Sequence, residues 1–139
     1  EAAALVSRLA GQLTAASSIF ETEAWGNTDQ NPFLNQVIAI RTGLAAADLM
    51  TLLLSIEEDM GRLRQELYGP RTIDIDILFF GSEIHHSQHV TIPHPEIVRR
   101  RFALVPMAEI APFMEHPVLL KTMALLLAEC TDPLVVQKI

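Results

Sequence analysis

The sequence predicts an α+β protein in which helices pack on a mainly antiparallel sheet. Segments with strand-like and helix-like patterns are interspersed along the 139 residues, without the strict alternation of a doubly wound fold. No glycine-rich phosphate loop follows any predicted strand. Half of the residues are hydrophobic and 19% are charged, which is typical of a chain that buries a core. We therefore expect one α+β sandwich domain spanning residues 1–139.

The first half of the chain is predicted to contain two helices and two strands. Residues 1–10 have apolar side chains on one helical face and are followed by glycine. Residues 13–22 and 33–42 are rich in β-branched and aromatic residues, which predicts two strands joined by a loop of turn-forming residues. Residues 45–60 carry leucine and isoleucine at helical spacing, and a polar connector follows at 61–67.

The most informative segment is a predicted central strand from Thr72 to Gly81, in which Asp74 and Asp76 alternate with isoleucines. Side chains alternate between the faces of a strand, so the two carboxylates would share one face, roughly 6–7 Å apart. Their charges repel, and a metal ion, a nearby arginine or solvent is needed to offset them. On pattern alone, an ordinary half-buried strand with a wet charged face is the more common arrangement.

The second half of the chain is predicted to end in helices. A polar segment with three histidines at 82–89 lacks metal-like spacing, so we expect these histidines to be exposed. A helix is predicted over 95–110, interrupted by Pro106, because proline cannot donate the helical hydrogen bond. Another helix is predicted over 118–129, and the tail at 131–139 is expected to add a short strand.

Composition excludes several classes of function. The net charge of −7 argues against a nucleic-acid surface, and no apolar run is long enough to span a membrane. The single cysteine, Cys130, excludes an internal disulfide, and we expect a cytoplasmic protein without a signal peptide.

The arginines are unevenly distributed. Six of the ten basic residues lie in one stretch of the chain: Arg62, Arg64, Arg71, Arg99, Arg100 and Arg101. Arginines gathered around a paired-aspartate strand indicate a site for a polyanion and its metal. Taken alone, the triplet Arg99–Arg101 is expected to be a solvated charge run.

The segment Gly69-Pro70-Arg71-Thr72-Ile73-Asp74-Ile75-Asp76-Ile77 resembles the signature of the 6-hydroxymethyl-7,8-dihydropterin pyrophosphokinase family. Further matches fall in family order: Phe20-Glu21-Thr22, Trp25-Gly26, Asp29-Gln30, Phe33-Leu34-Asn35, Gly61-Arg62-Leu63-Arg64 and Ile92-Pro93-His94-Pro95 through Arg100 and Phe102. The resemblance covers most of residues 12–112. It implies a ferredoxin-like fold and transfer of pyrophosphate from ATP to the hydroxymethyl group of the pterin, with release of AMP. It also implies two magnesium ions.

The resemblance also implies roles for individual residues. Asp74 and Asp76 would hold the metal and, with Arg62 and Arg71, form the catalytic set. The ATP-binding set would be Glu57, Arg64, Tyr68, Arg71, Ile77, His94 and Arg100. The pterin-binding set would be Thr22, Glu23, Trp25, Phe33, Asn35 and Phe102, with Phe33 and Phe102 stacking on the flat ring. Without the resemblance, His94 and both phenylalanines would be interpreted as structural or core residues.

The chain departs from the family pattern in three ways. The family begins with a strand and a Gly-Ser-Asn turn, whereas this sequence starts at the following helix; we therefore expect the sequence to omit residues, and its sheet to have an unpaired gap. The connector Arg64–Tyr68 is shorter than usual. Tyr68 stands where tryptophan is common, and Leu54 where a polar residue is common.

Two alternative hypotheses stay open. One is a non-catalytic ferredoxin-like binding module whose aspartate face is merely wet; the other is a degenerate relative that binds pterin or nucleotide without turnover. For the pyrophosphokinase, the expected partners are the small molecules ATP and 6-hydroxymethyl-7,8-dihydropterin, without nucleic acid or membrane. The expected assembly is a monomer or a weak homodimer.

Overall fold

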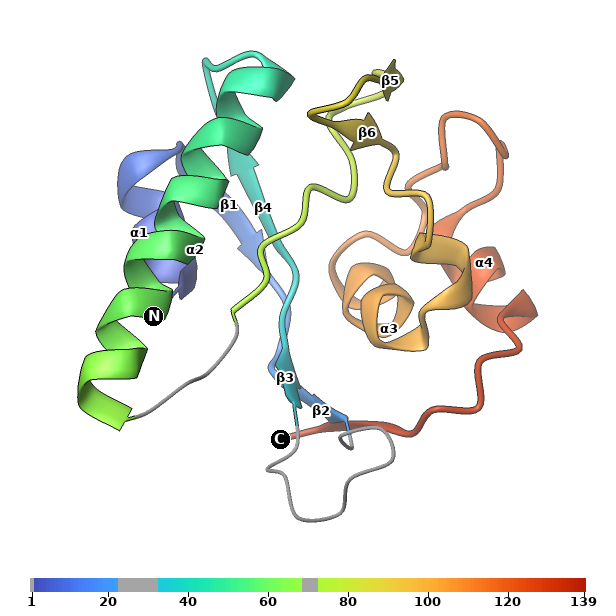
Figure 1. Cartoon of the computed structure of the whole chain (residues 1–139). Coiled ribbons are helices and arrows are strands. Elements are labelled where there is room, and N and C mark those ends of the chain that lie inside the picture. The colour runs from blue at the N-terminus through green and yellow to red at the C-terminus, as the bar shows by residue number, and fades with distance from the viewer. Residues whose placement is uncertain (1, 23–32, 69–72) are drawn as a thin grey trace. The chain divides into compact units, whose positions relative to one another are not determined.

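The computed structural model describes residues 2–22, 33–68 and 73–139, and for 62–68 it describes the backbone. Helices and strands are interspersed, which confirms the α+β class (Figure 1). The helices are α1 (Ala2–Leu9), α2 (Ala46–Tyr68), the 3-10 helix η1 (Ile97–Arg99), α3 (Arg101–Ile110) and α4 (Met123–Glu129). The strands are β1 (Gln12–Ala16), β2 (Phe20–Thr22), β3 (Phe33–Asn35), β4 (Ile38–Arg41), β5 (His85–His86), β6 (Thr91–Ile92) and β7 (Val136–Lys138).

The chain forms two compact units. The first comprises Glu1–Thr14 and Ile40–His94, and the second comprises Ala15–Ala39 and Pro95–Ile139. None of the described helices is both long enough and apolar enough to cross a membrane.

The first unit is built on helix α2, which packs beside α1 (Figure 1). The buried side chains of α2 recur three or four positions apart, which places them on one face: Ala46, Leu49, Leu53, Ile56 and Met60. Val6 of α1 and Ile77 are also buried in this unit. The predicted helix at 45–60 is therefore confirmed, and its apolar stripe forms the core.

Helix α2 continues to Tyr68, so the predicted polar connector at 61–67 is wrong. A glycine inside a helix costs only about 1 kcal/mol relative to alanine, and the residues after Gly61 are mostly strong helix formers. Gly61 also lies in open space, because a Cβ built there meets nothing within 4 Å. A polar segment can therefore still be helical.

The second unit contains a three-stranded antiparallel sheet in the order β3-β2-β7. Helix α3 packs against all three strands and against α4. The side chains buried in this unit include Phe20, Ile97, Leu104, Met107, Met123 and Leu126. Strand β7 confirms the predicted short strand in the tail, and it completes the sheet by pairing with β2.

Helix α3 runs through Pro106, where the sequence predicted an interruption. The proline removes one helical hydrogen bond, but Pro106 and its neighbours Leu104 and Met107 are buried, and that packing offsets the loss. The break lies instead at Arg100, whose extended backbone (φ −117°, ψ 98°) separates η1 from α3.

The two predicted strands at 13–22 and 33–42 are each divided in two, at Ser17–Ile19 and at Gln36–Val37. Phe20 is opposite Asn35, and the Ser17 N–H donates to the Val37 carbonyl at 2.8 Å. The ladder is interrupted here, so the pairs β1–β4 and β2–β3 belong to separate sheets.

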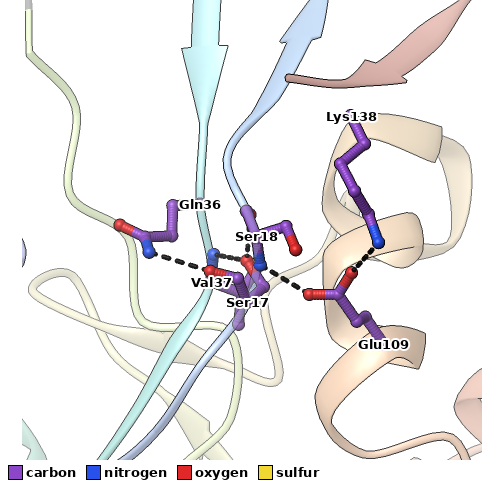
Figure 2. Close-up of polar contacts among 6 residues, drawn as sticks. All are labelled: Ser17, Ser18, Gln36, Val37, Glu109 and Lys138. Atoms are coloured by element: carbon purple, nitrogen blue, oxygen red, sulfur yellow. Dashed lines mark hydrogen bonds and ion pairs between the residues drawn. The ribbon is translucent and has the colours of Figure 1, made fainter.

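Side-chain hydrogen bonds connect the two segments at this interruption, as Figure 2 shows. The Ser17 hydroxyl accepts from the Val37 N–H at 3.0 Å, and the Gln36 amide donates to the Ser17 carbonyl at 2.9 Å. The Ser18 N–H donates to the carboxylate of Glu109 on α3, which also pairs with Lys138 of β7 at 3.1 Å. The hydrogen bond from Ser18 and the ammonium of Lys138 lower the pKa of Glu109.

Helix α4 begins at Met123, later than the predicted start at residue 118. The preceding residues turn around His116, whose Nδ1 accepts from the N–H groups of Val118 and Leu119 at 3.2 and 3.1 Å. Thr122 then caps the helix by accepting from the Leu125 N–H. Burial lowers the pKa of His116, which favours the neutral ring that this acceptor role requires.

Candidate functional site

Residues 73–80 do not form a strand, contrary to the prediction for Thr72–Gly81. Of the described strands, none forms a ladder with this segment, and extended chain becomes a strand only when it has such a partner. The predicted alternation is nevertheless present. Asp74 and Asp76 are exposed, whereas Ile77 is buried at 6% exposure. The two carboxylates therefore occupy the solvent side of this segment.

Glu57 of α2 holds the backbone between the two aspartates. Its Oε2 accepts a hydrogen bond from the Ile75 N–H at 2.8 Å. This bond gives the Ile75 N–H the acceptor that a neighbouring strand would otherwise supply. Hydrogen bonds to a carboxylate are among the stronger hydrogen bonds in proteins. The resemblance had implied a nucleotide contact for Glu57. The structure adds a backbone contact, which no sequence pattern could reveal across 18 positions.

His94 lies beside the second aspartate. Its backbone N–H donates to the Leu78 carbonyl at 2.9 Å, which fixes the histidine against the aspartate segment. The ring Nε2 is 3.8 Å from Asp76 Oδ2, and the imidazole side chain is 18% exposed. The structure thus brings together Glu57, Asp74, Asp76, Ile77 and His94 within the first unit.

The donor set of this group fits a hard divalent cation that arrives with other ligands. In the part of the chain that the structure describes, no group of three or more histidine, cysteine, aspartate or glutamate side chains could hold a metal by itself. Magnesium is commonly bound by one or two carboxylates together with substrate phosphates and water. Two exposed carboxylates match that requirement, whereas a resident zinc site would need more protein ligands.

A second group of predicted site residues lies in the second unit, on β2 and β3. Thr22 is opposite Phe33, and Asn35 is opposite Phe20, so the four side chains share one face of the sheet. The Asn35 amide donates to the Thr22 hydroxyl at 3.2 Å. Thr22 is 4% exposed and Phe33 is 54% exposed, so a fixed polar pair lies beside an exposed aromatic ring.

Arg100 and Phe102 flank the beginning of α3 in the same unit. The guanidinium carbon of Arg100 is 5.7 Å from the centre of the Phe102 ring, which is within the range of a cation–π interaction. Because α3 packs against β2 and β3, the elements that carry Thr22, Asn35 and Phe102 are in contact with one another.

The remaining predicted site residues are described in part or not at all. Glu23, Trp25 and Arg71 lie outside the described residues. For three others the structure describes only the backbone, which places them in the last two turns of α2: Arg62, Arg64 and Tyr68.

The arginine triplet is not uniformly solvated, contrary to the expectation from its charge alone. Arg99 is largely exposed, with an ion pair to Glu96 at 3.8 Å. Arg101 is half-buried, and its side chain donates to the carbonyls of Asp132 at 2.9 Å and Cys130 at 2.9 Å. The sequence held no signal for these contacts, because the partners lie about thirty positions away.

Comparisons with known proteins identify the family. The family model for 7,8-dihydro-6-hydroxymethylpterin-pyrophosphokinase (HPPK) matches residues 1–112. A 2-amino-4-hydroxy-6-hydroxymethyldihydropteridine pyrophosphokinase of Bacillus subtilis (strain 168) is 42% identical over 103 residues, which are 74% of this chain and 62% of the relative. Proteins of the same name from Methylorubrum extorquens and Synechocystis are 43% identical over 101 residues and 39% identical over 117 residues. These alignments cover 73% and 83% of this chain, and 64% and 60% of the relatives.

The structure defines an α+β protein with a pair of solvent-facing carboxylates in one unit and a hydroxyl, amide and aromatic group in the other. With the family model matching residues 1–112, the chain belongs to the 7,8-dihydro-6-hydroxymethylpterin-pyrophosphokinase family. It spans 60% to 64% of the length of the three curated relatives described above.

Proposed function

We propose that this chain is part of an enzyme that transfers pyrophosphate from ATP to the hydroxymethyl group of 6-hydroxymethyl-7,8-dihydropterin, releasing AMP, in folate biosynthesis. Membership of the family supports this proposal. The observation that carries it is the exposed carboxylate pair, Asp74 and Asp76, on a segment that Glu57 and His94 both contact.

In this proposal Asp74 and Asp76 hold two magnesium ions together with the triphosphate. Such ions would orient the phosphates and offset the charge that develops during transfer. Glu57 keeps the backbone between the aspartates in place, and His94 contacts the nucleotide close to Asp76. Further nucleotide contacts are assigned by resemblance to Glu57, Arg62, Arg64, Tyr68, Arg71, Ile77 and Arg100. The planar guanidinium group matches phosphate oxygens with two parallel hydrogen bonds.

The pterin would be bound by residues of β2, β3 and α3. A flat ring with donors and acceptors on its edge needs aromatic walls and a few fixed polar partners. Thr22 and Asn35 supply a preorganised hydroxyl–amide pair, and the exposed ring of Phe33 and the ring of Phe102 supply aromatic surfaces. Glu23 and Trp25 are assigned to the same site by resemblance.

Several broader assignments belong to the same proposal. The complete fold would be a ferredoxin-like sandwich forming a single pyrophosphokinase domain. The protein would be cytoplasmic and a monomer or a weak homodimer. None of its ligands would be a nucleic acid or a membrane.

The direct test is AMP production from ATP and the reduced pterin, with the full-length protein and magnesium. Isothermal titration calorimetry with a non-hydrolysable ATP analogue distinguishes the enzyme from the two alternative hypotheses. The enzyme should bind the analogue only with magnesium and then bind pterin more tightly. A binding module that uses neither ligand would give no heat in either titration. A degenerate relative would bind but release no AMP.

Removing either carboxylate tests the proposed metal-binding role of Asp74 and Asp76. Asp74→Asn and Asp76→Asn should each lower AMP production by roughly 100-fold or more, because several kcal/mol of transition-state stabilisation would be lost. Both side chains are exposed, so the melting temperature should change little. Asp48→Asn, at an exposed aspartate in the first turn of α2, is the matched control and should keep full activity. Full activity in both Asp74→Asn and Asp76→Asn would contradict the metal role.

A further inference from the structure

The chain beyond residue 112, outside the span that the family model matches, contacts the start of helix α3 through Asp132. The carboxylate Oδ2 of Asp132 accepts from the Arg101 N–H at 3.0 Å, and its Oδ1 accepts from the Leu134 N–H at 3.0 Å. One carboxylate therefore ties the first residue of α3 to the segment that leads into β7.

The Arg101 side chain adds two hydrogen bonds to the same segment. Its Nε donates to the Asp132 carbonyl at 2.9 Å, and its Nη2 donates to the Cys130 carbonyl at 2.9 Å. The planar guanidinium can make two such bonds only in one orientation, so the contact is directional. Residues 130–134 are thereby fixed across the amino end of α3.

Helix α3 depends on this distant acceptor because its own sequence supplies none. Its N-cap residue, Arg100, makes no side-chain capping bond, and the first turn contains no acidic residue. The first N–H groups of a helix have no acceptor within the helix, and a carboxylate there also interacts favourably with the helix dipole. Asp132 provides that carboxylate from 31 positions further along the chain.

We infer that Asp132, together with Arg101, is a positioning residue for Arg100 and Phe102. These two residues immediately flank Arg101 and stack on each other, with 5.7 Å between guanidinium and ring centre. The capped turn fixes the backbone from which both side chains leave. The inference rests on the proposed function, in which Arg100 contacts the nucleotide and Phe102 stacks on the pterin.

The test compares Asp132→Ala with Asp132→Asn in the full-length protein. Asp132→Ala removes both acceptors, and the Kd values for the pterin and for a non-hydrolysable ATP analogue should rise by roughly ten-fold, the size expected for a lost cap. Asp132→Asn keeps one acceptor oxygen, so its Kd values should lie between those of Asp132→Ala and the unaltered protein. The control is Glu129→Gln at the end of α4, which breaks an exposed ion pair with Lys121 and should leave both Kd values unchanged.

Binding should be measured well below the melting temperature of each variant, with hydrogen exchange at the Arg101 amide as an independent readout. Faster exchange in Asp132→Ala together with weaker binding supports the positioning role. Faster exchange with unchanged Kd values assigns Asp132 to stability alone and overturns the inference. If the unaltered protein binds neither ligand and releases no AMP, the proposed function itself has failed.

Discussion

At the scale of single residues, two buried polar side chains of the second unit serve as hydrogen-bond acceptors for backbone N–H groups. Ser17, at 5% exposure, accepts from Val37, and His116, at 7% exposure, accepts from Val118 and Leu119. These hydrogen bonds also give the buried Ser17 hydroxyl and His116 ring a partner, and a buried polar group without one costs roughly 1–3 kcal/mol. Small polar residues therefore determine where the regular elements of this unit are interrupted.

His116 makes stability depend on pH. Burial lowers the pKa of His116 in the native chain below the ordinary value of 6.5, which the unfolded chain keeps. At a pH between the native and the unfolded pKa, the unfolded chain binds a proton that the native chain excludes. The free energy of unfolding then falls as pH falls, and the contribution is fully present above 6.5. We expect urea unfolding to show lower stability at about pH 5.5 than at about pH 7.5.

The variant His116→Asn separates this effect from that of the other histidines. An asparagine oxygen can accept the same N–H groups but does not titrate in this range. The difference in unfolding free energy between the two pH values should therefore be smaller in His116→Asn. An unchanged difference would place the pH dependence elsewhere.

The sequence located the candidate residues better than it located their contacts. The alternation of Asp74 and Asp76 with isoleucines predicted the exposed carboxylate face, because side-chain direction follows from the backbone period alone. The hydrogen bond from Ile75 to Glu57 and the cap from Asp132 could not be predicted. Both depend on which distant segments pack together, and aspartate or glutamate on a surface has many possible partners.

At the scale of elements, helix α2 contains an internal glycine, Gly61, at a position where the structure leaves room for a larger side chain. A Cβ at Gly61 meets nothing within 4 Å, so Gly61→Ala should raise the free energy of unfolding by about 0.5–1 kcal/mol through helix propensity and reduced freedom of the unfolded chain. Urea unfolding with an unchanged slope would measure the gain. A loss of stability would show that the helix is not continuous at this position.

Gly11→Ala is the contrasting variant in the same unit. A Cβ at Gly11 would lie 2.2 Å from the Arg41 carbonyl oxygen, so backbone must move and stability should fall. The free energy of unfolding should rise in Gly61→Ala and fall in Gly11→Ala. Replacing glycine by alanine therefore has no uniform effect, and the space around each glycine decides the sign.

The elements that sequence patterns misplaced have definite physical causes. The pattern at 72–81 predicted a strand, but a strand also requires a partner ladder, and residues 73–80 have none among the described strands. The interruption at residues 17–19 and 36–37 divided two predicted strands, and nothing in the local composition marks it. By contrast, the apolar spacing within 45–60 predicted helix α2 correctly over that range.

At the scale of the whole molecule, the second unit depends on residues beyond those that the family model matches. Residues 113–139 supply α4, with the buried Met123 and Leu126, and also supply β7 and the cap from Asp132. Fold class could be predicted from the order of patterns, because interspersed helices and strands without a phosphate loop leave few alternatives. The division into two compact units could not, because it depends on which segments pack together.

Deleting residues 113–139 should therefore disorder the second unit selectively. Hydrogen exchange measured by mass spectrometry should show lost protection in residues 15–22 and 95–112, while residues 46–60 of α2 stay protected. The matched control is the longer chain under the same conditions. Retained protection of residues 15–22 would mean that β2 is stable without its β7 neighbour.

The pairing of β2 with β7 has a consequence for synthesis. Phe20 is opposite Lys138, so β2 leaves the ribosome long before the segment that covers its second edge. Until then, one row of its backbone donors and acceptors stays available to other nascent chains, which is a known route to aggregation. Rapid translation at high expression should therefore burden this chain more than a protein whose neighbouring strands follow one another directly.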